Sequence, residues 1–134
     1  MFLFDTTVWI DYLKNAQTPH TKLLSLSLSK NRVFSCPTLF QEILQGMRDR
    51  KKYEEVYSLL FLATNRIENE PYQVAVGAAN MYRTLRAKGI TIRKPNDCLI
   101  AWYCLENNLE LVHNDIDFDM IAKHFPLKIW SDKA

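Results

Sequence analysis

Four acidic residues lie beside apolar segments, at points where a carboxylate could do chemistry. Asp5 closes a short apolar run at the start of the chain, and Asp115 follows another one near its end. Glu42 lies within a helical pattern, and Asp97 opens a second one. Carboxylates that share a cleft repel each other unless they are protonated or hold a cation. Oxygen ligands suit Mg²⁺ or Mn²⁺, so these acids, with Asp117 as a further candidate, predict a divalent-metal site if the fold brings them together.

Each acid also has a simpler explanation. Asp5 suits the cap of the helix that follows it, where Thr6 and Thr7 are further candidates. Asp97 would complement the dipole of its helix. Glu42 fits an ordinary helix surface, and Asp115 a turn. Only their joint occurrence favours a site.

Apolar runs and helical spacing alternate along the chain and predict the elements that position these acids. Strands are expected at residues 2–5, 32–35, 109–112 and 127–130, with a weak one within 65–69. Helices are expected at 8–13, 21–29, 38–45, 51–63, 72–88, 97–107 and 117–124. Strands separated by helices imply a parallel sheet covered on both faces. Ligands bind such sheets at the carboxyl ends of the strands, which is where Asp5 and Asp115 are expected.

Composition narrows the class of protein. A chain of 134 residues without internal repeats fits a single domain spanning 1–134. No apolar run is long enough to cross a membrane, and the first residues lack the pattern of a signal peptide. Three cysteines without a paired spacing favour reduced thiols, and therefore a cytoplasmic protein.

The sequence lacks the motifs of several other classes of enzyme. The three glycines form no phosphate-binding loop, no serine lies in a nucleophile elbow, and no Cys/His group has zinc spacing. A phosphoacceptor receiver domain would need a second acid beside Asp5, and a haloacid-dehalogenase-type phosphatase would need one at Thr7. These absences leave the acidic group as the best candidate for catalysis.

The four acids lie in segments that resemble the motifs of the PIN-domain family, and within it the VapC-type toxin ribonucleases. Phe-Leu-Phe-Asp5-Thr-Thr is similar to the first motif, and Glu42-Ile-Leu-Gln-Gly46 to the second. Asn96-Asp97-Cys-Leu-Ile-Ala resembles the third, and His113-Asn-Asp115-Ile-Asp117 the fourth. The four segments occur in order over nearly the whole chain.

The resemblance implies a fold and an activity. The fold would be a three-layer α/β/α sandwich with a central, mainly parallel sheet of four to five strands. The activity would be that of a Mg²⁺-dependent endoribonuclease, with Mn²⁺ as an alternative ion. Water activated by the metal would hydrolyse structured RNA, in tRNA or rRNA loops. The protein would be the toxin of a toxin–antitoxin pair, a homodimer inhibited by a VapB-like antitoxin.

The resemblance also assigns roles to residues. The catalytic set is Asp5, Glu42, Asp97 and Asp115, and the metal ligands are Asp5, Asp97, Asp115 and Asp117. Three residues are expected to support these acids by hydrogen bonds: Thr6, Thr7 and His113. Six basic residues near the motifs are candidates for contacting the RNA backbone: Arg48, Arg50, Lys51, Lys52, Arg93 and Lys94.

Two other functions remain open at this stage: a non-catalytic module of the same fold that binds RNA or protein, and a metal-dependent nuclease that acts on DNA. A group of aromatic residues also exceeds what a small core obviously needs. Core packing is the commoner explanation of such a group, and a surface for a second copy or an antitoxin is the alternative. The group comprises Trp9, Tyr12, Tyr53, Tyr57, Phe61 and Tyr72.

Overall fold

A parallel sheet of five short strands forms the centre of the molecule. The structure is a computed structural model that describes residues 1–132. The strands are β1 (Phe2–Phe4), β2 (Val33–Ser35), β3 (Asn65–Arg66), β4 (Glu110–Val112) and β5 (Lys128–Ile129). They lie in the order β3-β2-β1-β4-β5, and every neighbouring pair is parallel. The predicted parallel sheet is confirmed.

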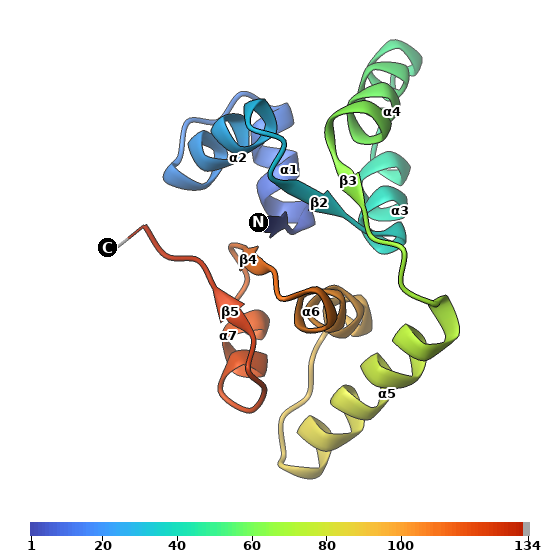
Figure 1. Ribbon diagram of the computed structural model, residues 1–134, viewed down its shortest axis with the longest axis vertical. Helices are drawn as coiled ribbons and strands as arrows, with labels where there is room; N and C mark the ends of the chain where they lie inside the picture. Colours follow the sequence, from blue (N-terminus) through green and yellow to red (C-terminus); the bar gives the residue numbers. More distant parts are fainter. Residues whose placement is uncertain (133–134) are drawn as a thin grey trace.

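Seven helices in the described part of the chain flank this sheet. They are α1 (Thr6–Leu13), α2 (Pro19–Ser29), α3 (Pro37–Gln45), α4 (Arg50–Ala63), α5 (Pro71–Ala87), α6 (Pro95–Asn107) and α7 (Ile116–Ala122). Figure 1 shows α1 and α2 on one side of the strands, α5 to α7 on the other, and α3 and α4 beside the β3 end of the sheet. Right-handed crossovers cover both faces of a sheet when the chain first winds outward from β1 to β3 and then returns through β4 to β5. The three-layer α/β/α sandwich is therefore confirmed.

Proline and capping side chains set where the helices begin. Pro19, Pro37, Pro71 and Pro95 each occupy the first position of a helix, where the missing N–H costs no intrahelical bond. Pro19 opens α2 two residues before the predicted start of that helix at 21. The first helix begins at Thr6 and is capped by Asp5, so Thr6 and Thr7 are helical residues and not caps.

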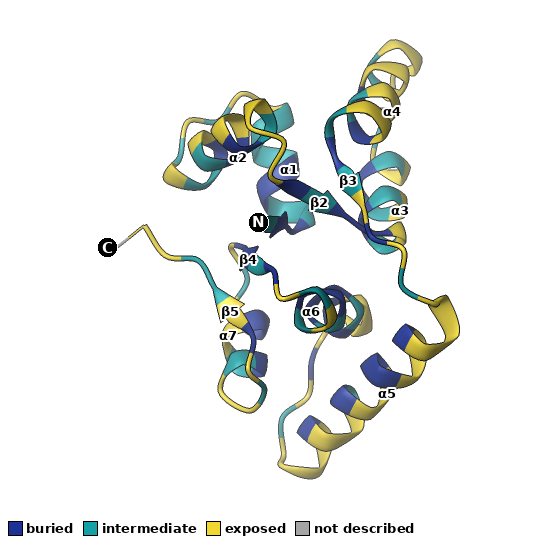
Figure 2. Cartoon of the chain, in the orientation of Figure 1, coloured by how far each residue is buried: buried dark blue, intermediate teal, exposed yellow. Residues whose placement is uncertain are grey.

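The core lies between the sheet and the inward faces of the helices. Leu3, Phe4, Leu111 and Val112 of the two central strands are fully buried, as expected for a sheet covered on both faces. Figure 2 shows that α5 is buried only along the edge that faces α6, while α6 is buried on most sides. Among the described residues, no helix is long and apolar enough to cross a bilayer.

Candidate active site

Asp5 and Asp115 follow the two strands, β1 and β4, at which the winding direction of the sheet reverses. The chain leaves β1 toward β2 and β3 and then crosses back to β4, so β1 and β4 are neighbours whose connections run in opposite directions. Phe4 pairs with Val112 at the carboxyl ends of these strands. The next residue, Asp5, donates its backbone N–H to the carbonyl of Val112 at 3.0 Å. Such a reversal leaves a crevice between the strand ends, and the Asp5 and Asp115 segments both begin there.

Three carboxylates at this edge come close enough to share an ion. Asp97, Asp115 and Asp117 each offer one oxygen, and these oxygens lie within 4.8 Å of one another. Asp97 and Asp117 are buried, while Asp115 is partly buried. We call these three residues the acidic cluster. Asp5 and Glu42 lie near enough to Asp97 to act on its charge.

Asp97 is the member of the acidic cluster with the greatest need for a cation. It lies in the first turn of α6 and is 5% exposed. Its Oδ2 atom is buried and has no hydrogen-bond partner in the part of the chain that the structure describes. Burial, followed by the charge of Asp115, raises the pKa of the Asp97 carboxyl to about 7. A bound divalent ion would supply the missing partner, so the residues fit a metal site.

Asp5 caps a helix while it faces the site. Its Oδ1 accepts hydrogen bonds from the hydroxyl of Thr7 at 2.7 Å and from the backbone N–H of Val8 at 3.4 Å. Burial raises the pKa of the Asp5 carboxyl to about 6, although these hydrogen bonds oppose the shift. The simpler explanation of Asp5 as a cap is thus correct, and it is compatible with a role in the site because the second oxygen is not needed for capping.

Glu42 is oriented by a residue from a different helix. It lies in the second turn of α3, where it is partly buried, and its Oε1 accepts a 2.8 Å hydrogen bond from the hydroxyl of Thr6 on α1. Because α3 packs against α1, this bond holds the carboxylate on the side of α3 that faces the acidic cluster.

The segment after β4 is held by His113. Its Nδ1 accepts the backbone N–H of Asp115 at 2.9 Å, so the imidazole proton lies on Nε2, which is 3.2 Å from Oδ1 of Asp119. Burial lowers the pKa of His113, which keeps the ring neutral near pH 7. Asp115 in turn caps α7 by accepting the N–H of Asp117 at 3.0 Å. Its pKa is lowered: burial acts upward, but this N–H, Lys94 and Arg93 together outweigh it.

Two of the six basic residues predicted to contact RNA, Arg93 and Lys94, contact the acidic cluster. The guanidinium of Arg93 lies 3.1 Å from Asp115 and 3.2 Å from Asp117, and the ammonium of Lys94 lies 3.7 Å from Asp115. The other four lie at the start of α4 or just before it. Of these, Arg50 pairs with Glu54 at 3.2 Å, and Lys52 donates to the carbonyl of Leu13 at 3.4 Å.

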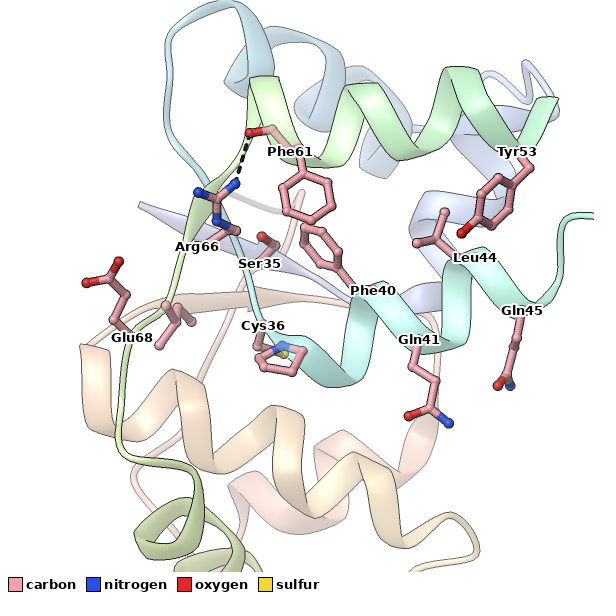
Figure 3. A pocket seen from close by; sticks show the side chains of 12 residues that line it. Ser35, Cys36, Phe40, Gln41, Leu44, Gln45, Tyr53, Phe61, Arg66 and Glu68 are labelled. Carbon is pink, nitrogen blue, oxygen red and sulfur yellow. Dashed lines mark hydrogen bonds between the residues drawn. The ribbon is translucent and has the colours of Figure 1, made fainter. Parts of the chain in front are cut away.

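A second feature, an apolar groove of about 740 Å³, lies between α3, α4 and the segment around β3. Figure 3 shows the rings of Phe40 and Phe61 packed against each other in its wall, with centroids 4.9 Å apart, and Arg66 and Glu68 at one end. Of the aromatic residues for which a surface was the alternative to core packing, Tyr53 and Phe61 line this groove. Trp9 does not belong to any surface, because it is fully buried in the core.

The sequence of the chain is similar to those of known proteins. The family model described as PIN domain matches residues 2–124. "VapC ribonuclease Mb1587" of Mycobacterium bovis and "Ribonuclease VapC11" of Mycobacterium tuberculosis are each 32% identical to this chain over 130 residues, which cover 92% of the chain and 92% of the relative.

Solved structures share the fold at lower identity. DNA-bound VapBC from Salmonella typhimurium matches with a TM-score of 0.77 and 20% identity, and VapBC2 from Rickettsia felis, bound to a promoter DNA fragment, with 0.76 and 17%. Each match covers 96% of both chains.

Proposed function

Because the chain belongs to the PIN-domain family, we propose that it is a metal-dependent endoribonuclease and the toxin of a toxin–antitoxin pair. The two relatives named as VapC ribonucleases support this activity, since the chain matches them over nearly their whole length. The observation that carries the proposal is the buried, unpartnered Oδ2 of Asp97 within the acidic cluster.

The metal is proposed to be Mg²⁺, or Mn²⁺ in its place. Asp97 and Asp115 would hold it, with Asp5 completing the set from the neighbouring strand end and Asp117 as an additional ligand. When bound, such an ion neutralises charge on the phosphate and lowers the pKa of an attacking water. Glu42, held in place by Thr6, would orient that water.

Water is the proposed nucleophile, so the 2′-hydroxyl of the RNA takes no part in bond breaking. The water oxygen attacks phosphorus, the bond to the 3′-oxygen breaks, and that oxygen leaves with a proton. The products therefore carry 5′-phosphate and 3′-hydroxyl ends, whereas attack by the 2′-hydroxyl would give cyclic phosphates.

The proposed substrate is structured RNA, cut in a single-stranded loop of tRNA or rRNA, where bases and backbone are accessible. The basic residues at the start of α4 or just before it are the proposed backbone contacts: the exposed Arg48, Arg50 and Lys51 and the partly buried Lys52. Arg93 and Lys94 lie at the acidic cluster itself and would meet the phosphates next to the cleavage point.

The proposed partners are a VapB-like antitoxin and a second copy of the chain. The VapBC complexes of the same fold support an antitoxin. Exposed apolar side chains supply surface for both partners, on α4 with Tyr53, Tyr57 and Leu62 and on α5 with Tyr72 and Val76. The three cysteines are buried free thiols, which supports a reducing location, the cytoplasm.

Parallel cleavage assays test this function. Purified protein is incubated with total RNA and with single-stranded DNA, in Mg²⁺ and in EDTA, beside the Asp5→Asn variant. We expect cleavage of RNA in Mg²⁺ only, and none by the variant. Cleavage of DNA alone would favour the DNA nuclease, and binding without any cleavage would favour a non-catalytic module; either result overturns the proposal.

A further inference from the structure

Arg93 makes three contacts with two members of the acidic cluster. Its Nε donates to Oδ2 of Asp117 at 3.2 Å, its backbone N–H donates to the same oxygen at 3.2 Å, and its Nη2 donates to Oδ1 of Asp115 at 3.1 Å. The guanidinium therefore bridges two carboxylates that belong to the proposed metal site. It supplies part of the positive charge that these acids need in order to stay ionised side by side.

The exposure of the three side chains is unequal. The side chain of Arg93 is 66% exposed, whereas those of Asp115 and Asp117 are only 10% and 9% exposed. The acids are therefore fixed parts of the fold, and the arginine reaches them from solvent. Its side chain can leave without opening the core, and its backbone N–H can stay on Asp117 when it does.

A divalent ion among Asp97, Asp115 and Asp117 would lie close to this guanidinium. Two positive charges at such distance repel each other, and Arg93 already occupies one oxygen of each of the two acids. An ion that ligates Asp115 or Asp117 must therefore displace the guanidinium or share its oxygens. The apparent affinity for the ion is the intrinsic affinity multiplied by the fraction of molecules in which the competing contact is broken.

We propose that Arg93 is a built-in counter-cation of the acidic cluster, which is exchanged for the metal and thereby sets the affinity of the site for divalent ions. This inference rests on the proposed metal-dependent function. It makes Arg93 a positioning residue for the metal, since it acts on the site through the two acids. The phosphates that its displaced side chain would meet are those next to the cleavage point. The proposed exchange also gives Asp117 a role distinct from that of Asp115: Asp117 anchors the arginine segment by both backbone and side chain.

Lys94 provides a matched control. It carries the same charge on the neighbouring residue, but its ammonium reaches only Asp115, at 3.7 Å. Removing either side chain makes the field around the site more negative by one charge. Only the removal of Arg93 frees both carboxylates from a bridging contact.

The experiment is a calorimetric titration of the metal-free full chain with Mn²⁺, above the pKa values of the site acids. We expect Arg93→Gln to bind Mn²⁺ about fivefold more tightly than the wild type, Arg93→Lys to lie between them, and Lys94→Gln to change affinity less than twofold. A second readout is the Nε–H signal of Arg93 in nitrogen-15 NMR, which should shift when Mg²⁺ saturates the wild-type protein.

The outcomes separate this inference from the function on which it rests. If the wild type binds Mn²⁺ and Arg93→Gln binds it equally or more weakly, or if Lys94→Gln gives the same gain, the exchange is overturned and the metal-dependent function stands. An Nε–H signal that does not move on saturation overturns it as well. If neither the wild type nor Arg93→Gln binds Mn²⁺, the proposed metal dependence itself fails.

Discussion

The hydroxyl of Thr6 donates a 2.8 Å hydrogen bond to Glu42, a residue on another helix and 36 positions further along the chain. Thr6 follows directly after Asp5, so one dipeptide supplies a carboxylate to the site and orients a second one. The pairing depends on the packing of α1 against α3, and it makes Thr6 the simplest residue with which to test whether the orientation of Glu42 matters.

Replacing Thr6 by Val is expected to lower kcat/KM for RNA cleavage roughly 10- to 100-fold, the usual effect of removing a hydrogen bond to a catalytic or metal-binding group. The side chain keeps its shape, so the thermal midpoint should change little. Thr6→Ser keeps the hydroxyl and should retain most activity. Equal activity of the Val and Ser variants would show that this bond has no part in catalysis.

The pKa values of two site acids predict how stability depends on pH when no metal is present. Burial raises the pKa of Asp5 to about 6 and that of Asp97 to about 7, from an ordinary value of 3.8. Between the ordinary value and the raised ones, these two carboxyls are protonated more often in the folded protein than in the unfolded chain. The free energy of unfolding therefore falls as the pH rises from about 4 to about 7, by a few kcal/mol in order of magnitude.

Urea unfolding in EDTA across this pH range measures the effect. Asp97→Asn removes the largest of the two shifts, so its stability should fall less steeply and exceed that of the wild type near pH 8. Two lowered pKa values act in the opposite direction. That of Asp115 does so only at pH values below its ordinary range, and that of His113 does so below about 6.5, where it offsets part of the fall. A wild-type stability that rises steadily from pH 4 to 7 would contradict the buried, unpaired state of these acids.

A glycine at the contact between α5 and α6 gives a prediction about packing. A Cβ atom on Gly77 would overlap the indole ring of Trp102. Alanine in a helix gains up to about 1 kcal/mol over glycine, but overpacking costs about 1–3 kcal/mol, so Gly77→Ala should be destabilising. Thermal unfolding checks this, with Ala79→Gly on the exposed side of α5 as the comparison. A more stable Gly77→Ala protein would mean that Trp102 moves aside without loss.

The apolar groove gives a prediction about inhibition. If the antitoxin docks there, a charge at Tyr53, which is 39% exposed and lines the groove, should weaken inhibition of RNA cleavage at least tenfold. Glu55, exposed on the same helix but two residues away, supplies the control Glu55→Ala. Cleavage is measured against increasing concentrations of the proposed VapB-like antitoxin. Equal inhibition of Tyr53→Glu and wild type would place the antitoxin elsewhere.

The strands and the two acids after them were predictable because both signals are local. Phe2–Phe4 is a short apolar run, and residues 109–112 form a mostly apolar one. Ligands that bind a parallel sheet do so at the carboxyl ends of its strands. The order of the strands was not predictable in this way. Phe2 pairs with Glu110 as well as with Val33, and no pattern in either segment specifies which strand lies beside which.

The contacts of Arg93 could not be predicted from the sequence either. Together with Lys94 it forms a basic pair before a proline, which is equally consistent with an RNA contact or a solvated surface. Its partner Asp117 lies 24 residues away in a different motif, and only the packing of α6 against α7 brings the two together. For Trp9 the sequence left core packing and a surface as alternatives, and core packing is correct, since the residue is fully buried.

The position of a bound ion tests the central claim most directly. Crystals of the protein soaked in Mn²⁺ and measured at the manganese absorption edge would show the ion as an anomalous peak. We predict a peak within direct coordination distance of Asp97 and Asp115, which Asp97→Asn abolishes. A peak at a different surface, or none at saturating Mn²⁺, would contradict the account.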